Sequence, residues 1–253
     1  MKRIILIPAR LESSRLPKKV LLDLGGKPMI QRVYEQCILV KEVDVFIATD
    51  SEEIKTACSN FTTNILTTRA DHRSGTDRIA EAIKQLSSYD YVINVQADEP
   101  FIEPSLISSL FDSLEKKEVK MVSAMHKIRS IKALHDPSVV KVITDAQNNA
   151  LYFSRACIPF DAQQDKTNIR DLNYSSHSYF KHLGIYGFKR AFLIEFAATK
   201  MGRLEKLEKL EQLRALENGV KIKMIETNYT TLGIDTPEDY QEAINIYEQQ
   251  QSK

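Results

Sequence analysis

Short apolar runs alternate with longer amphipathic segments along most of this chain, and that alternation limits the folds open to it. Residues 4–7, 43–49 and 91–95 have the length and the branched apolar content of buried strands. Between them, residues 28–39 and 76–86 carry apolar side chains at helical spacing. Apolar strands separated by helices are typical of a mostly parallel sheet with helices on both faces. We therefore predict an α/β chain.

The second half of the chain departs from this simple alternation. Residues 139–144 and 150–154 flank a polar stretch with Asn148, which predicts a β-hairpin. Leucines recur every third residue through 203–217, and Gly219 follows, which predicts one helix with a left-handed cap. The same criteria predict helices over residues 104–114 and 190–198, strands over 182–188 and 222–226, and a last helix capped by Thr236 and Asp239.

Composition excludes several classes of protein. The 253 residues are 43% apolar and carry a net charge of +1, so nothing in the overall charge points to nucleic acid as a partner. The first apolar run is too short for membrane insertion. Cys37, Cys58 and Cys157 lack the spacing of a zinc site or a disulfide framework, which fits a cytoplasmic protein. No linker divides the chain, so we expect a single domain over residues 1–253.

A basic segment directly follows the first predicted strand. Arg10, Arg15, Lys18 and Lys19 place four cations within ten residues there. Ligands of open α/β sheets bind at the carboxyl ends of strands, and both Arg and Lys suit phosphate oxygens. No GxGxxG or P-loop pattern follows the strand. A phosphate site built from side-chain cations is therefore favoured over a solvated basic loop.

Carboxylates occupy two further places of interest. Asp98 and Glu99 end the predicted strand 91–95, and Asp235 stands just before the last helix. Mg²⁺ takes one or two carboxylates together with phosphate oxygens and water. Each aspartate taken alone is more often a cap or turn residue, and sequence spacing does not show whether they meet. By itself, Ser74 is an ordinary N-cap and His182 an ordinary structural histidine.

Taken together, these segments resemble one family. The matching stretches are residues 6–10, 14–17, 26–30, 48–50, 68–78, 94–100, 150–155, 182–187, 210–214 and 235–239, in the family's order. The chain resembles the 3-deoxy-manno-octulosonate cytidylyltransferase (CMP-Kdo synthetase) family. The resemblance implies a Rossmann-like nucleotide-diphospho-sugar transferase fold. It assigns residues 1–125 and 220–253 to a nucleotide-binding core, and 126–219 to a smaller mixed subregion for the sugar and dimerisation.

The resemblance also implies an activity. The expected reaction moves CMP from CTP to 3-deoxy-D-manno-octulosonate (Kdo), or to its 8-amino analogue, and releases pyrophosphate. The product, CMP-Kdo, would serve lipopolysaccharide biosynthesis. A cytidylyltransferase for another sugar acid, and a nucleotide-binding paralogue without turnover, remain alternatives. The expected cofactor is Mg²⁺ and the expected assembly a homodimer.

Specific residues acquire expected roles through this resemblance. Asp98 and Asp235 match the metal ligands, and with Lys19, Arg10 and Arg15 they form the expected catalytic set. The nucleotide would be bound by Ala9, Arg10, Arg15, Lys19, Arg73, Ser74, Gln96 and Asp98. The sugar would be bound by Arg78, Gln96, His182, Tyr186, Glu211 and Gln212, with Arg78 as the candidate partner of its carboxylate.

Two positions depart from the family pattern. Ala97 stands where the family usually has glycine, so its methyl group is expected to crowd the nucleotide or to exclude a backbone geometry that only glycine tolerates. Lys18 also replaces a usual glycine, and it would stiffen the basic loop or add a phosphate contact.

Overall fold

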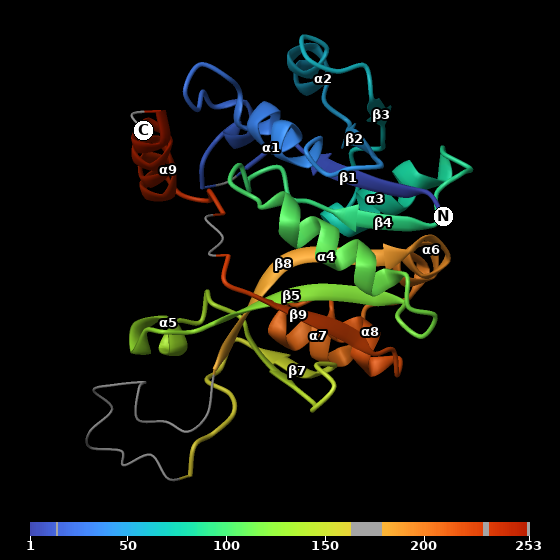
Figure 1. Cartoon of the computed structure of the whole chain (residues 1–253), viewed down its shortest axis with the longest axis vertical. Coiled ribbons are helices and arrows are strands. Elements are labelled where there is room, and N and C mark those ends of the chain that lie inside the picture. Colours follow the sequence, from blue (N-terminus) through green and yellow to red (C-terminus); the bar gives the residue numbers. More distant parts are fainter. Residues whose placement is uncertain (14, 163–178, 230–232, 252–253) are drawn as a thin grey trace.

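One sheet connects both halves of the chain. The computed structural model describes residues 1–13, 15–162, 179–229 and 233–251 (Figure 1). Within these residues nine strands form the sheet, in the order β3-β2-β1-β4-β8-β5-β9, with β6 and β7 attached beside β8. The predicted α/β architecture, with a mostly parallel sheet, is confirmed.

The N-terminal half supplies four parallel strands. They are β1 (Arg3–Ala9), β2 (Val43–Thr49), β3 (Ile65–Thr67) and β4 (Tyr91–Asn94). β1 lies between β2 and β4, and all three are nearly free of polar residues on both faces. Because the strands run the same way, the basic segment after β1 and the carboxylates after β4 emerge at the same edge of the sheet.

The C-terminal half adds one antiparallel strand in the middle of the sheet. β8 (Phe180–Lys189) runs against both β4 and β5 (Met121–Lys127), and β9 (Ile222–Thr227) is parallel to β5. The strand β5 was not predicted. β8 comes from the stretch expected to form the sugar-binding subregion, and its Tyr186 lies opposite Asn94 of β4. Residues of the two expected parts therefore meet within one sheet, and the proposed division stays a prediction.

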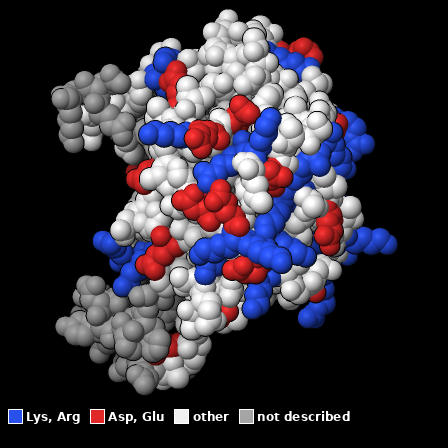
Figure 2. Space-filling view, turned by 45° about the vertical axis from the view of Figure 1, so that its right-hand side comes forward, with Lys and Arg blue, Asp and Glu red and all other residues white. Residues whose placement is uncertain are grey.

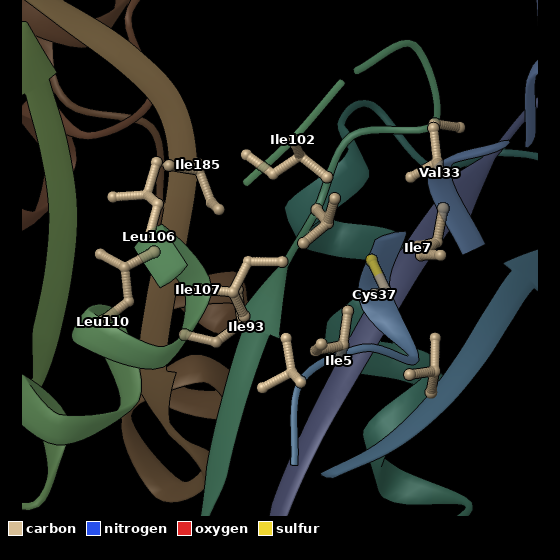
Figure 3. Packing of buried hydrophobic residues seen from close by; sticks show 14 of the residues in the cluster. Ile5, Ile7, Val33, Cys37, Ile93, Ile102, Leu106, Ile107, Leu110 and Ile185 are labelled. Carbon is tan, nitrogen blue, oxygen red and sulfur yellow. The ribbon is translucent and has the colours of Figure 1, made fainter. Parts of the chain in front are cut away.

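Helices cover one face of the sheet with apolar side chains. α1 (Met29–Cys37), α2 (Glu52–Cys58) and α4 (Pro104–Leu114) pack there. Leu106, Ile107 and Leu110 of α4 lie against Ile93 of β4 and Ile185 of β8 (Figure 3). Burying such a side chain is worth about 1.5–3 kcal/mol. This face fixes the strands whose ends form the site.

The other face is covered by α3 (Gly75–Lys84) and α6 (Arg190–Ala198). The predicted hairpin is present as β6 (Lys141–Thr144) and β7 (Ala150–Ser154), and it packs on this face through Val142 and Phe153. Asn148 adopts a left-handed conformation (φ 57°) in its turn, as asparagine tolerates. The hairpin prediction is confirmed.

The prediction of one helix over residues 203–217 is wrong. The segment forms two short helices, α7 (Arg203–Glu208) and α8 (Leu213–Glu217), separated by Lys209 in a left-handed conformation (φ 54°). Leucine spacing indicates only local helical periodicity, whereas the break between α7 and α8 is stabilised by residues distant in the sequence. The carboxylate of Glu208 accepts hydrogen bonds from the Ser154 hydroxyl (2.6 Å) and the Arg155 N–H (3.0 Å).

A buried ion pair closes the two short helices on each other. Arg214 of α8 donates from Nε and Nη2 to the two carboxylate oxygens of Glu205 in α7, at 2.7 and 2.5 Å. Their side chains are only 3% and 4% exposed. The turn between the helices carries Glu211 and Gln212, so this ion pair determines where those two expected sugar residues lie.

The last helix returns to the N-terminal loop. α9 (Pro237–Gln251) begins with the predicted capping box, in which the N–H of Thr236 donates to Asp239 (2.8 Å) and the N–H of Asp239 donates to the Thr236 hydroxyl (3.2 Å). Ile234 and Ala243 pack with Leu24 and with Met29, the first residue of α1. The remaining elements are a 3₁₀ turn, η1 (Lys19–Leu21), and α5 (Ile131–His135). No helix of the described residues is both long and apolar enough to cross a membrane.

Candidate functional site

The carboxyl ends of β1 and β4 and the N-terminus of α3 enclose an open cleft of about 700 Å³. A Cβ at Gly75, the first residue of α3, would lie 3.0 Å from the ring of Pro8, so glycine lets the helix approach β1 closely. The cleft is lined by Pro8, Ala9, Arg10, Glu12, Lys19, Val20, His72, Arg73, Ser74, Gly75, Arg78, Gln96, Ala97 and Asp98. Most of the expected nucleotide residues are therefore brought together here.

The two expected metal ligands converge on one ammonium group. Lys19 Nζ donates to Asp98 Oδ2 and, at 2.7 Å, to Asp235 Oδ1. The other oxygen of Asp235 contacts Arg15 Nη2 at 2.8 Å. Sequence spacing did not show whether these aspartates meet, and the fold places them at the same atom.

The charges in this cluster stabilise one another. Burial lowers the pKa of Lys19, but the Asp98 charge and the hydrogen bond to Asp235 outweigh it and raise the pKa above its ordinary value. Burial likewise raises the pKa of Asp235, and the hydrogen bond and charge of Lys19, with Arg15, lower it overall. The ammonium and the Asp235 carboxylate are therefore both ionised at neutral pH.

The donor set fits a hard divalent cation. Asp98 and Asp235 each present an oxygen to a single cationic atom, so both can also face one metal ion. Across the described residues, no three His, Cys, Asp or Glu side chains gather into a metal cage. Mg²⁺ usually takes only one or two carboxylates and completes its shell with phosphate oxygens and water. The residues present thus suit magnesium held jointly with a phosphate ligand.

The N-terminus of α3 forms the opposite wall of the cleft. Ser74 is its N-cap and accepts a hydrogen bond from the Asp77 N–H at 3.1 Å. Helix N-termini favour anions and hydrogen-bond acceptors. Arg73 is exposed and contacts Asp77 at 3.3 Å. Arg10 is exposed on the β1 side and makes no ion pair with any residue that the structure describes.

Arg78 lies in the wall of the cleft with its charge already paired. Its guanidinium contacts the Asp50 carboxylate at 2.7 Å and donates to the Thr68 hydroxyl at 2.6 Å. The residue is only 5% exposed. Asp50 comes just before α2, whose N-cap is the neighbouring Ser51, which accepts from the Ile54 N–H.

A chain of hydrogen bonds leads from the cleft to a neighbouring hollow. Gln96 donates to Asn94 (3.4 Å), Asn94 donates to Thr76 (3.5 Å), and the Thr76 hydroxyl donates to Glu211. Glu211 lines the hollow, which shares Arg73 and Ser74 with the cleft. Burial raises the pKa of Glu211 despite its hydrogen bonds from Thr76 and Ser74.

The other three expected sugar residues form a buried cluster. The Tyr186 hydroxyl donates to Gln212 at 3.1 Å, and Gln212 lies 3.5 Å from His182 Nδ1. His182 Nε2 is 2.8 Å from the Ser123 hydroxyl, and its ring meets Phe153 edge-on. Burial lowers the pKa of His182 to about 3, so the imidazole is neutral. These three side chains contact one another, and their role toward a sugar stays a prediction.

The two departures from the family pattern have simple structural outcomes. The Ala97 backbone does not have a positive φ, so no glycine-only geometry is required there. The residue is 5% exposed, belongs to the apolar cluster on the α4 face and also lines the cleft. Lys18 does adopt a left-handed conformation (φ 54°). Its ammonium binds both oxygens of Glu53 at 2.8 and 2.9 Å, so it is occupied by a carboxylate.

His72 is a cleft residue that the sequence did not single out. Its Nε2 contacts the Glu81 carboxylate, which also accepts from the Arg69 N–H at 3.2 Å. Burial raises the pKa of Glu81, but the hydrogen bonds from His72 and Arg69 lower it overall. The nine-residue separation of His72 and Glu81 gives no local motif, because one lies in a loop and the other on α3.

Charge on the visible surface is mixed. Basic and acidic side chains are interspersed on the face shown in Figure 2. This agrees with the net charge of +1 and with the ion pairs that the site residues form. Any attraction for a polyanionic ligand on this face must therefore come from local geometry.

Comparison with known proteins agrees with the fold. The cytidylyltransferase family pattern matches residues 4–222. The chain is 45% identical to the 3-deoxy-manno-octulosonate cytidylyltransferase of Pelobacter propionicus over an alignment of 253 positions that covers 98% of each chain. It is 41% identical to that of Solibacter usitatus over 243 residues, covering 95% of this chain and 92% of the other.

Solved structures agree with this fold, and one of them also agrees with the family. A CMP:2-keto-3-deoxy-manno-octonic acid synthetase complexed with CTP superimposes with a TM-score of 0.90 at 37% identity, covering 99% of this chain and all of the other. A 4-diphosphocytidyl-2C-methyl-D-erythritol synthase from Anaerococcus prevotii shares the fold at a TM-score of 0.62 and 16% identity, over 98% and 96% of the two chains. The chain therefore belongs to the 3-deoxy-manno-octulosonate cytidylyltransferase family.

Proposed function

We propose that the chain transfers CMP from CTP to 3-deoxy-D-manno-octulosonate, giving CMP-Kdo and pyrophosphate. The observation that carries the proposal is the meeting of Asp98 and Asp235 at Lys19, beside a cleft that opens onto the N-terminus of α3. The similar proteins, named for the cytidylyl transfer to this sugar acid and in one case solved with CTP, support CTP as donor and the sugar acid as acceptor.

The cleft offers a different environment for each part of CTP. Arg10, Arg15 and Lys19 would bind the triphosphate, since a guanidinium or ammonium contact to phosphate is charge-assisted. Ala9 and Ser74, on facing walls, would bind the nucleoside, with Arg73 and Gln96 beside them. Asp98 lines the same cleft and accepts from Lys19, which suits a group that would act near the α-phosphate.

The reaction is an in-line displacement at phosphorus. The anomeric hydroxyl oxygen of the sugar forms a bond to the α-phosphorus, the bond from that phosphorus to the bridging oxygen breaks, and pyrophosphate leaves with the bonding electrons. The protein's contribution is positioning and charge neutralisation. Arg10, Arg15 and Lys19 would stabilise the departing pyrophosphate. The hydroxyl proton passes to solvent, and we assign no side chain as its acceptor.

Magnesium is the proposed cofactor. Asp98 and Asp235 would hold it, because their oxygens already face a common cation. When bound, it would offset charge at the α-phosphate and lower the pKa of the attacking hydroxyl.

The sugar would lie between Gln96 and the turn that carries Glu211. Its carboxylate needs a cationic partner, and Arg78 is available only through guanidinium atoms that Asp50 and Thr68 leave free. His182, Tyr186 and Gln212 would act indirectly. Their contacts would hold the turn between α7 and α8 against β8. The 8-amino analogue remains within the proposal as an alternative acceptor.

The test is product formation with a panel of acceptors. The protein is incubated with CTP and Mg²⁺ together with Kdo, its 8-amino analogue, sialic acid or methylerythritol phosphate, and products are identified by mass. We expect CMP-Kdo or its 8-amino counterpart, with stoichiometric pyrophosphate. Turnover only with another acceptor would replace the proposed substrate, and CTP binding without any turnover would indicate a silent paralogue.

Three further properties belong to the proposal. The product would serve lipopolysaccharide biosynthesis, the chain would act in the cytoplasm, and two copies would form a homodimer. The three described cysteines are all unpaired, which is compatible with a reducing compartment. Light scattering of the purified protein would test the assembly.

A further inference from the structure

Lys19 occupies the position between the two carboxylates. Its ammonium contacts one oxygen of Asp98 and one of Asp235, and the side chain is only 15% exposed. Asp98 follows β4, whereas Asp235 comes 216 residues after Lys19. Three separate segments therefore converge to place one positive charge between two negative charges.

The same oxygens are the ligands that a hard divalent cation requires. An ammonium is a compact point charge with three donors, so it satisfies a pair of carboxylates much as a metal ion does. An ammonium and a metal ion cannot both contact these two oxygens closely, because like charges at such distances repel strongly outside bulk water. Lys19 and a divalent cation thus compete for Asp98 and Asp235.

We propose that Lys19 is a built-in counter-ion that keeps divalent cations weakly bound until the triphosphate arrives. This inference rests on the proposed function of the site. In the nucleotide-free protein the ammonium pairs with Asp98 and, together with Arg15, with Asp235. The phosphates of CTP give the ammonium new anionic partners, and the two carboxylates are then released for the cation.

The exchange links nucleotide binding to cation binding. If CTP increases the affinity for the cation by a given factor, the cation increases the affinity for CTP by the same factor, because the two binding events share one thermodynamic cycle. Part of that factor comes from direct contact between cation and phosphate. The part due to Lys19 is the competition that CTP relieves, and it disappears when the ammonium is removed.

The test measures Mn²⁺ binding to nucleotide-free protein by electron paramagnetic resonance. Mn²⁺ prefers the same oxygen ligands as Mg²⁺ and is directly visible. We expect Lys19→Met to bind Mn²⁺ about tenfold more tightly than the wild type, or more, because two carboxylates lose their competing partner. Lys19→Gln serves as the second variant if Lys19→Met does not fold, as judged by circular dichroism.

Lys18→Met is the matched control. It removes the same charge from the adjacent residue, but the Lys18 ammonium binds Glu53 and contacts neither aspartate. We expect its Mn²⁺ affinity to stay within about twofold of the wild type, because only screened, longer-range charge is lost. Adding CTP without acceptor should strengthen Mn²⁺ binding more in the wild type than in Lys19→Met.

Two results would overturn the inference. One is Mn²⁺ affinity in folded Lys19→Met or Lys19→Gln no higher than in Lys18→Met. The other is an equal gain from CTP in the wild type and in Lys19→Met. Failure of the proposed function would be a separate result: the wild-type protein would form no CMP-sugar with any acceptor in the presence of Mg²⁺.

Discussion

Asp98 is the residue on which the proposed chemistry most depends. Replacing it with asparagine keeps the shape of the side chain but removes the charge that faces Lys19. We expect turnover of Asp98→Asn to fall by about a hundredfold or more, since electrostatic groups at a reacting centre contribute on that scale. Steady-state kinetics and circular dichroism would check activity and fold. Asp112→Asn, in an exposed pair with Arg3, is the control, and an equal loss there would contradict the assignment.

Another residue-scale prediction concerns pH. Burial lowers the pKa of His182 to about 3, compared with about 6.5 in an unfolded chain. Below pH 6.5 the His182 imidazole is protonated in the unfolded state but stays neutral in the folded state. The free energy of unfolding therefore falls as pH drops toward 3.

Between pH 6.5 and 4.5 this loss amounts to about 2 kcal/mol from His182 alone. Urea unfolding of His182→Gln should therefore show a shallower pH slope than the wild type. His135→Gln, at an exposed position, should leave the slope unchanged. Parallel slopes for His182→Gln and the wild type would mean that the imidazole is not held neutral.

Single residues also show how far the sequence alone could define the site. The basic segment and Asp98 were recognisable because their order along β1 and β4 places them at one edge of the sheet. The pairing of Arg78 with Asp50 was not, since it joins residues from the ends of different strands and helices. The role of His72 as a cleft residue was unreadable for the same reason, because its partner Glu81 lies on α3.

At the scale of elements, the ion pair that joins α7 and α8 carries the clearest prediction. Arg214→Met leaves the Glu205 carboxylate buried without its partner, which typically costs about 3–5 kcal/mol. Urea unfolding should show this loss, and Arg203→Met, an exposed change on α7, should cost less than about 0.5 kcal/mol.

The double variant Glu205→Leu with Arg214→Met should recover much of that stability, because it buries no lone charge. If the double variant is less stable than Arg214→Met alone, the ion pair is not the cause. Loss of the pair should also weaken acceptor binding more than CTP binding, because Glu211 and Gln212 lie in the turn that it supports.

Elements also differ in how well local pattern predicts them. The bounds of β2, α4 and α6 agree with the sequence prediction, because each is rich in apolar residues; in addition β2 is followed by the N-cap of α2, and α4 begins at Pro104. β5 was missed, since Ser123 and His126 interrupt its apolar run and are satisfied only by β8 and β9. The break between α7 and α8 likewise depends on partners far away in the sequence.

At the scale of the whole molecule, the site should stabilise the fold when it is occupied. Its walls come from β1, α3, β4 and the segment before α9, so a ligand bound there favours all of them together. CTP with Mg²⁺ at a hundred times the dissociation constant would add about 2.7 kcal/mol. For a chain of this size that corresponds to a rise in Tm of roughly 5–10 °C.

Differential scanning calorimetry with and without CTP and Mg²⁺ would measure the shift, and removing Mg²⁺ with a chelator should reverse most of it. Asp98→Asn should show a much smaller rise. Two separate transitions, only one of them responsive to the ligand, would show that the parts enclosing the cleft unfold independently.

The late position of Asp235 has a consequence for biosynthesis. A ribosome makes Lys19 216 residues before it makes Asp235, the second carboxylate that this ammonium contacts. While translation is in progress, the nascent polypeptide carries the cationic loop and Asp98 but lacks the group that completes the cluster. The cluster is therefore complete only after Asp235 has been made and the segment before α9 has reached the N-terminal loop.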